Sequence, residues 1–160
     1  MNARTILIGG IVASLVIAMW EMLVEAVLPG GAGFFGPPIA IGATVIRDLQ
    51  GSPNPIPFDL AVLVLGLAGH MMNSVVLAAV FGLAVGRRGL TTTGLLVAGV
   101  AWGVMVFGAM WFVVVPIVDP LVLNLNAAAF LAGHVMWGAA LGYLWARVGA
   151  SDRVSSPSAA

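Results

Sequence analysis

Four long apolar stretches constrain the fold of this chain more than any other feature. They cover residues 5–28, 58–85, 91–115 and 124–148. Each stretch reaches the roughly 20 residues that an α-helix needs to cross a hydrocarbon core about 30 Å thick. Lipid offers the backbone no hydrogen-bond partner, so helices are expected, and the alternation typical of membrane barrel strands is absent. The sequence therefore predicts an all-α membrane protein with four transmembrane helices.

The amino-acid composition agrees with lipid as the surrounding solvent. The chain is 61% hydrophobic and only 8% charged, whereas soluble domains carry about 25% charged residues. It has no lysine and no arginine cluster larger than Arg87-Arg88, which excludes a nucleic-acid partner, because that needs a broad basic surface. It also has no cysteine, which excludes disulfides and thiolate metal sites. The expected partners are the lipid bilayer and either a second copy or a larger membrane complex.

Several residues mark the expected ends of the helices. Pro116, followed by Asp119-Pro120, is expected to close the third helix, because proline cannot donate the hydrogen bond that continuation requires. Asp59 stands just before the second helix, and Asn124 or Asn126 just before the fourth. Such side chains accept hydrogen bonds from the unpaired N–H groups of a first turn, so they are predicted to cap these two helices.

The helices are predicted to form one domain over residues 1–150, with a single long loop at 29–57. Within this loop, residues 39–49 have apolar side chains at roughly helical spacing, which predicts a short helix lying at the membrane interface. An extended loop packed over the bundle is the alternative. Residues 151–160 are small and polar, and they are predicted to form a disordered tail.

The placement of the arginines predicts the orientation of the protein. The arginines near both termini and in the turn after the second helix lie on one side, whereas Arg47 alone lies on the other. Those on the first side are Arg4, Arg87, Arg88, Arg147 and Arg153. By the positive-inside rule, both termini are expected in the cytoplasm.

The chain repeats itself, which predicts two tandem related helical hairpins at about 5–86 and 91–148. Residues 67–72 (LAGHMM) and 131–136 (LAGHVM) are identical at five of six positions and contain both histidines of the protein. The sequence AMW also occurs twice, and each time a proline follows nine residues after the tryptophan. Two matches in the same order favour duplication over chance similarity.

Both hairpins begin on the same side of the membrane, so a pseudo-twofold axis along the membrane normal is expected to relate them. The second and fourth helices then run in the same direction, with His70 and His134 at similar depths near the bilayer midplane. Both histidines are expected to point toward the shared axis. Glycines spaced four residues apart, at 82 and 86, at 99 and 103 and at 138 and 142, predict close helix packing.

Three short motifs carry a resemblance to a known group of proteins. They are residues 134–142 (HVMWGAALG), 111–116 (WFVVVP) and 36–38 (GPP). In these motifs the chain resembles a group of uncharacterised bacterial four-helix integral membrane proteins that includes the YagU-like family. The likeness extends over most of the chain. It implies the four-helix topology and a place in the inner membrane of a bacterium, and it implies no particular chemistry.

Four ionisable residues form the candidate site. Ionisable groups inside a membrane are costly, and each is a functional hypothesis by default. His70 and His134 form the central pair, and Glu21 is expected close above them. Glu25, one helical turn from Glu21, is expected at the mouth of the site.

Three functions fit such a site. The two histidines, each beside a glycine, could ligate a haem b iron from opposite sides and support electron transfer. The histidines with Glu21 and Glu25 could bind a divalent metal, or relay protons or transported cations. The same residues could instead bond one another and tie the hairpins together, in a non-enzymatic bundle or a subunit of a membrane complex. No nucleophile motif or phosphate-binding loop is present, so no enzyme activity is predicted.

Overall fold

The computed structural model describes residues 3–86 and 88–154, with side chains up to residue 148. All regular secondary structure in these residues is helical, as the sequence predicted. In chain order the elements are α1 (Ala3–Val27), the short α2 (Gly36–Gly42), the 3-10 turn η1 (Arg47–Leu49), α3 (Leu60–Val85), α4 (Thr92–Ala109), the π-helical turn η2 (Met110–Val114), α5 (Val115–Val118), the 3-10 turn η3 (Pro120–Asn124) and α6 (Ala127–Val154).

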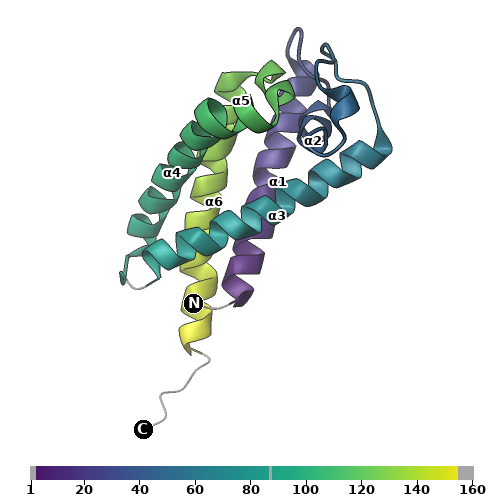
Figure 1. The fold of residues 1–160 in the computed structure, drawn as a ribbon. Helices are drawn as coiled ribbons and strands as arrows, with labels where there is room; N and C mark the ends of the chain where they lie inside the picture. The colour runs from purple at the N-terminus through teal and green to yellow at the C-terminus, as the bar shows by residue number, and fades with distance from the viewer. Residues whose placement is uncertain (1–2, 87, 155–160) are drawn as a thin grey trace.

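Four helical segments are long and apolar enough to cross a membrane, which confirms the predicted number. They are Ala3–Val27, Leu60–Val85, Thr92–Val118 and Ala127–Val148. The start of α1, the connection between α3 and α4 and the end of α6 lie at one end of the bundle, here called the termini end (Figure 1). The opposite end, here called the α2 end, holds α2 and α5.

The C-terminal boundary of the fold falls within the predicted tail. Helix α6 extends to Val154 and so includes residues 151–154, which the sequence assigned to a disordered segment. Residues 155–160 and Arg87 lie outside the described residues.

Two of the predicted helix caps are present. The Asp59 carboxylate accepts the Val62 N–H at 3.0 Å, and the Asn126 side-chain oxygen accepts the Ala129 N–H at 3.0 Å. Each cap satisfies one of the N–H groups that a first helical turn leaves without an internal partner. The caps therefore fix where α3 and α6 begin.

The third span continues past Pro116 and ends at Val118, so the prediction is wrong for Pro116 and is confirmed for Asp119-Pro120. Its α-helical turns are interrupted by the π-helical turn Met110–Val114, and the helix resumes as α5 until Val118. Proline has no N–H to donate to the carbonyl four residues earlier, and its ring crowds that carbonyl. The wider π turn directly before Pro116 accommodates the ring, and the span continues.

The 29–57 connection packs against the bundle, as in the alternative prediction of a packed loop, but it contains a short helix as in the first prediction. Its helix α2 covers Gly36–Gly42 and not 39–49, because Pro37-Pro38 suits the first turn of a helix and starts it early. Most residues of α2 are buried. A Cβ atom on Gly66 of α3 would collide with the Pro38 carbonyl. Glycine at this position therefore allows α2 and α3 to make backbone contact.

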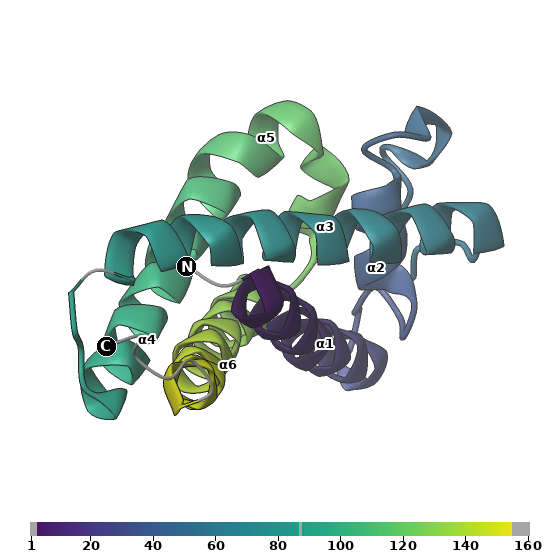
Figure 2. The same cartoon turned by 90° about the horizontal axis from the view of Figure 1, so that it is seen from below.

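Glycines also set the packing of α4 against α6. A Cβ atom on Gly99 would collide with the Gly138 carbonyl, and one on Gly103 with the His134 carbonyl. These small residues bring the two backbones into contact, as their spacing predicted. Helix α1 packs against both α6 and α3, and Figure 2 shows α1 and α6 side by side with α3 running across them.

Helices α3 and α4 make few contacts with each other. The end of α3 and the beginning of α4 lie close together at the termini end, and the two helices diverge toward the α2 end (Figure 1). A pseudo-twofold relation between the hairpins would make the α3–α4 interface equivalent to the α1–α6 interface. The second of these is closely packed and the first is open. The divergence leaves a cavity between α3 and α4.

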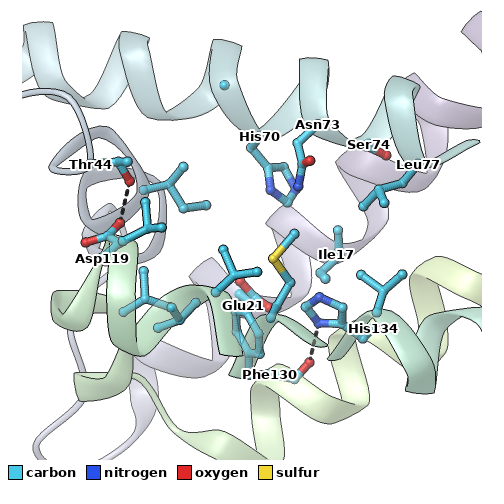
Figure 3. A pocket seen from close by; sticks show the side chains of 18 of the residues that line it. Ile17, Glu21, Thr44, His70, Asn73, Ser74, Leu77, Asp119, Phe130 and His134 are labelled. Carbon is cyan, nitrogen blue, oxygen red and sulfur yellow. Dashed lines mark hydrogen bonds between the residues drawn. The ribbon is translucent and has the colours of Figure 1, made fainter. Parts of the chain in front are cut away.

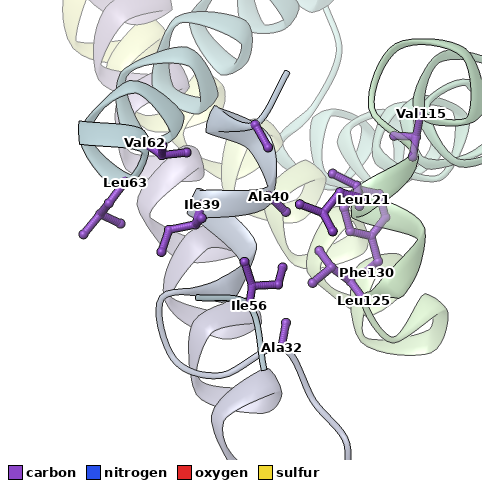
Figure 4. Close-up of a cluster of buried hydrophobic side chains, with 12 residues drawn as sticks. Ala32, Ile39, Ala40, Ile56, Val62, Leu63, Val115, Leu121, Leu125 and Phe130 are labelled. Atoms are coloured by element: carbon purple, nitrogen blue, oxygen red, sulfur yellow. The ribbon is translucent and has the colours of Figure 1, made fainter. Parts of the chain in front are cut away.

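Two clusters of buried apolar side chains surround this cavity. The α2-end core joins the 29–57 connection to α3 and to the α5–α6 region (Figure 4). It contains Ala32, Ile39, Ala40, Ala43, Ile56, Val62, Leu63, Val115, Leu121, Val122, Leu125 and Phe130. The termini-end core joins α1, α3, α4 and α6, and contains Ala13, Ile17, Ala78, Phe81, Val85, Leu95, Val106, Trp137, Leu141, Trp145 and Ala146. Members of both cores line the cavity, which therefore lies between them.

Candidate functional site

The cavity has a volume of about 360 Å³ and is lined by residues of all the helical elements except η1, together with part of the connection after α2. Most of its lining residues are apolar. The polar ones are Glu21, Thr44, His70, Asn73, Ser74, Asp119 and His134. Small-molecule sites in proteins are typically about 300–1,000 Å³, with apolar walls and a few polar groups. The cavity has the size and composition of such a site.

Helical periodicity explains why these side chains share one cavity. His70 and Ser74 are four residues apart on α3, so they lie on the same helix face. Phe130, His134 and Trp137 are four and three residues apart on α6 and lie on one face for the same reason. Figure 3 shows the α3 side chains extending toward the side chains of α6 across the cavity.

Both histidines line the cavity, and each uses one ring nitrogen on a backbone carbonyl. His134 Nδ1 donates to the Phe130 carbonyl at 2.8 Å. His70 Nε2 donates to the Ser14 carbonyl of α1 at 3.3 Å. A carbonyl oxygen can only accept, so each of these nitrogens carries a proton. In the neutral rings, His134 Nε2 and His70 Nδ1 are then hydrogen-bond acceptors.

Glu21 is the buried acid of the cavity. It is only 4% exposed, and it lines the cavity together with the two histidines. Its Oε1 is buried and has no hydrogen-bond partner among the described residues. Gly133 of α6 makes room for it, because a Cβ atom there would lie 3.1 Å from Glu21 Oε1. The Oε1 atom of this carboxyl group therefore lacks a described partner that would compensate its burial.

Glu25 does not join the other three predicted site residues. It is 3% exposed, and it is not among the residues that line the cavity. Its carboxylate accepts the Ala32 N–H at 2.9 Å and the Asn126 N–H at 2.7 Å. Backbone donors thus occupy both oxygens, which gives Glu25 a structural role instead of the predicted place at the mouth of the site.

A second polar group, at the α2 end of the cavity, was missed by the sequence analysis. Asp119 accepts hydrogen bonds from the Thr44 hydroxyl at 2.7 Å and from the Gln50 amide. The Gln50 side-chain oxygen in turn accepts the Leu121 N–H at 3.1 Å. Thr44 and Gln50 are 75 and 69 residues from Asp119 in the chain, and no spacing rule relates them. The only sequence signal was an acidic residue directly before a proline.

The positions and hydrogen bonds of the histidines and acids limit how a metal ion or haem b could be held. No group of three or more His, Asp or Glu side chains in the described part of the chain is arranged to hold one metal ion. For haem b to be held by both imidazoles, His70 would have to release the Ser14 carbonyl from Nε2 or bind iron through Nδ1. His134 already has the arrangement typical of a ligating histidine, with Nδ1 bonded to a carbonyl and Nε2 available.

Functional assignment of this cavity rests on its own residues and geometry. The resemblance to YagU-like proteins stays a prediction. Neither a protein-family model, nor a curated protein, nor a solved structure matches this chain.

Proposed function

We propose that this chain is a non-enzymatic, multi-pass membrane protein that binds a small ligand within the bilayer, in the cavity between α3 and α4. The observation that carries this proposal is the Glu21 carboxyl, which lines the cavity and has a buried oxygen without a partner among the described residues. A buried ionisable group is costly unless a partner compensates it. A ligand in the cavity would supply that partner.

Access from the lipid supports a ligand that dissolves in the membrane. Asn73 lies midway along α3, lines the cavity and is exposed. Its exposure marks an opening between α3 and α4 at the depth of the hydrocarbon core. Polar side chains at this depth typically face a protein interior or a functional cavity. A molecule in the bilayer can therefore reach the cavity without passing the polar ends of the bundle.

The purely structural alternative has less support. It expects the histidines and glutamates to bond one another. His70 and His134 donate to backbone carbonyls instead, and Glu21 Oε1 bonds no described residue. Glu25 alone among the four ties the first hairpin to the second, through Asn126.

The proposed orientation places both termini in the cytoplasm and the α2 end outside it, in the inner membrane of a bacterium. Arg4, Arg88 and Arg147 belong to the termini end, whereas Arg47 belongs to the α2 end, where it donates to the Val118 carbonyl at 2.7 Å. Cytoplasmic ends of membrane proteins carry an excess of arginine and lysine, which supports this orientation.

A duplicated hairpin would account for the origin of the cavity. His70 and His134 come from the repeated LAGHxM sequence, and both line the same cavity. In a symmetric pair of hairpins the α1–α6 and α3–α4 interfaces would be equivalent. We propose that the first interface remained closed after duplication and that the second opened to form the site.

Two glycines provide a direct test of ligand binding. A Cβ atom on Gly69 of α3 or Gly108 of α4 would meet nothing within 4 Å. Gly69 lines the cavity, whereas Gly108 is not among its lining residues. Gly69→Leu is therefore expected to fill the cavity, and Gly108→Leu is expected to leave it open. At neither position would the added Cβ atom collide with the backbone.

The measurement is saturation-transfer NMR on the protein in lipid nanodiscs, with 4-phenyl-1-butanol and 4-phenylbutylamine as probes. Transfer from wild type and Gly108→Leu to at least one probe, with most of it lost in Gly69→Leu, is the expected result. Equal transfer from all three proteins would contradict the proposal, because it would report only the partition of the probes into lipid.

A further inference from the structure

The polar groups of the cavity are mostly hydrogen-bond acceptors. Glu21 Oε1 has no donor among the described residues, and each neutral histidine donates its one N–H to a backbone carbonyl, which leaves its other ring nitrogen as an acceptor. The Ser74 hydroxyl donates to the Gly10 carbonyl at 2.7 Å, so its donor is already used. The Asn73 amide is the only donor group on a lining side chain for which no bond to a described residue is seen. A complementary ligand must therefore bring donors.

The ionisable residues that line the cavity also favour a cationic ligand. Two acids, Glu21 and Asp119, are among its described lining residues, and no arginine is. Asp119 already accepts hydrogen bonds on both oxygens, from Thr44 and Gln50. Glu21 has no such compensation. A cation that enters the cavity would favour the ionised form of the Glu21 carboxyl, because a nearby opposite charge stabilises it.

The acceptors are too widely spread for a single metal ion. No three His, Asp or Glu side chains among the described residues come close enough to form one coordination sphere. An organic cation differs from a metal ion because its donors and its apolar body extend over several ångströms. The whole cavity has a volume of about 360 Å³. The apolar body of such a cation would fill the part that its charged group leaves free.

The apolar walls fit such a body. Phe130 and Trp137 of α6 line the cavity beside His134, and the Phe130 and His134 ring centroids are 4.5 Å apart. Aromatic faces attract cations, and aliphatic side chains from several other elements, among them α1, α3 and α5, make up most of the remaining lining. We propose that the ligand is a small organic cation whose ammonium group pairs with Glu21 and whose apolar body occupies the rest of the cavity. This inference rests on the proposed ligand-binding function and specifies its substrate class.

The same arrangement disfavours other small lipid-soluble ligands. A quinone or another carbonyl compound offers acceptors, which would face the acceptors of Glu21, His70 and His134. A carboxylate ligand would add repulsion from Glu21. Leaving a buried acceptor unpaired costs more than the bond itself contributes, so donor-poor ligands are expected to bind more weakly.

The test uses three probes with one common body and different head groups. 4-Phenylbutylamine is a cation at neutral pH, 4-phenyl-1-butanol is neutral and 4-phenylbutyrate is an anion. Dissociation constants are measured by calorimetry in nanodiscs of zwitterionic lipid, with empty nanodiscs subtracted. The proteins are wild type, Glu21→Gln, Gly69→Leu and, as the matched control, Gly108→Leu.

Wild type is expected to bind the amine at least about tenfold more tightly than the alcohol, since a hydrogen bond to a charged group is worth that factor or more. Glu21→Gln is expected to remove this preference while the alcohol still binds. If the alcohol binds as tightly as the amine and Gly69→Leu abolishes both, the cation inference is overturned and the ligand site stands. If no probe distinguishes Gly69→Leu from wild type, the proposed function is overturned as well. The comparison of probes on wild type decides the ligand class even if Glu21→Gln does not fold.

Discussion

The Glu25 carboxylate and the backbone N–H of Asn126, 101 residues apart in the chain, are joined by a hydrogen bond of 2.7 Å. The second carboxylate oxygen accepts the Ala32 N–H at 2.9 Å. One side chain of α1 thus holds both the beginning of the 29–57 connection and the beginning of α6. Hydrogen bonds to an ionised acceptor are stronger than those between neutral groups, so this contact is a major tie between the hairpins.

Glu25→Gln is expected to lower the free energy of unfolding by about 1–3 kcal/mol. Glutamine keeps one oxygen, and its NH₂ group would face the N–H that loses its acceptor. Thermal unfolding in mild detergent checks the effect. Asp48→Asn is the matched control, because Asp48 is exposed, and such a substitution usually changes stability by less than about 0.5 kcal/mol. Equal midpoints for the two variants would rule out this role of Glu25.

Alanine substitutions of two serines on neighbouring helices should have different effects on the stability of the protein. Trp137 Nε1 donates to Ser74 Oγ at 2.8 Å, and Ser74 Oγ donates to the Gly10 carbonyl at 2.7 Å, which links α6, α3 and α1. The Ser14 hydroxyl oxygen is also buried but has no partner among the described residues.

Ser74→Ala is therefore expected to destabilise the protein by about 1 kcal/mol, since hydrogen bonds between membrane helices average about 0.6 and reach about 1.7 kcal/mol. Ser14→Ala is expected to be neutral or slightly stabilising, because it removes a buried hydroxyl group that bonds no described residue. Unfolding by denaturing detergent would measure both. A larger loss in Ser14→Ala than in Ser74→Ala would refute the assignment of these two hydroxyl groups.

The parts of the fold that were predictable depend on local chemistry. The spans follow from runs of apolar residues, and the Asp59 and Asn126 caps follow from a single side chain beside the first turn that it caps. The burial of α2 depends on Gly66, a residue of another helix that admits the Pro38 carbonyl. No pattern within 29–57 contains that information. The continuation past Pro116 likewise depends on a π turn that the sequence does not mark.

Local sequence patterns predicted only part of the candidate site. Ionisable residues in apolar runs identified Glu21, His70 and His134, which share the cavity. Helical spacing put Glu25 on the Glu21 face of α1, but its partners come from returning backbone that local spacing cannot place. The Asp119 group joins residues about 70 positions apart, so only the fold brings it together.

The α4–α6 interface should be sensitive to a single added methyl group. A Cβ atom on Gly138 would collide with the Gly99 carbonyl, whereas one on Gly108 would meet open space. Gly138→Ala is expected to cost about 1–3 kcal/mol through overpacking. Gly108→Ala is expected to be neutral or to stabilise by up to about 1 kcal/mol, because alanine is the better helix former. Thermal unfolding of the two variants tests this, and a tolerant Gly138→Ala would disprove the close approach.

The orientation can be tested by labelling single introduced cysteines, because the chain contains no cysteine of its own that would react. Asp48 in η1 and Thr93 in the first turn of α4 are exposed and lie on opposite sides of the α3 span. In intact bacterial cells, Asp48→Cys is expected to react with a membrane-impermeant maleimide, and Thr93→Cys only after the membrane is opened. The reverse pattern would mean that the termini face outward, contrary to the orientation inferred from the arginines. Reaction of both in intact cells would mean that α3 does not cross the bilayer, since a single crossing must separate these two positions.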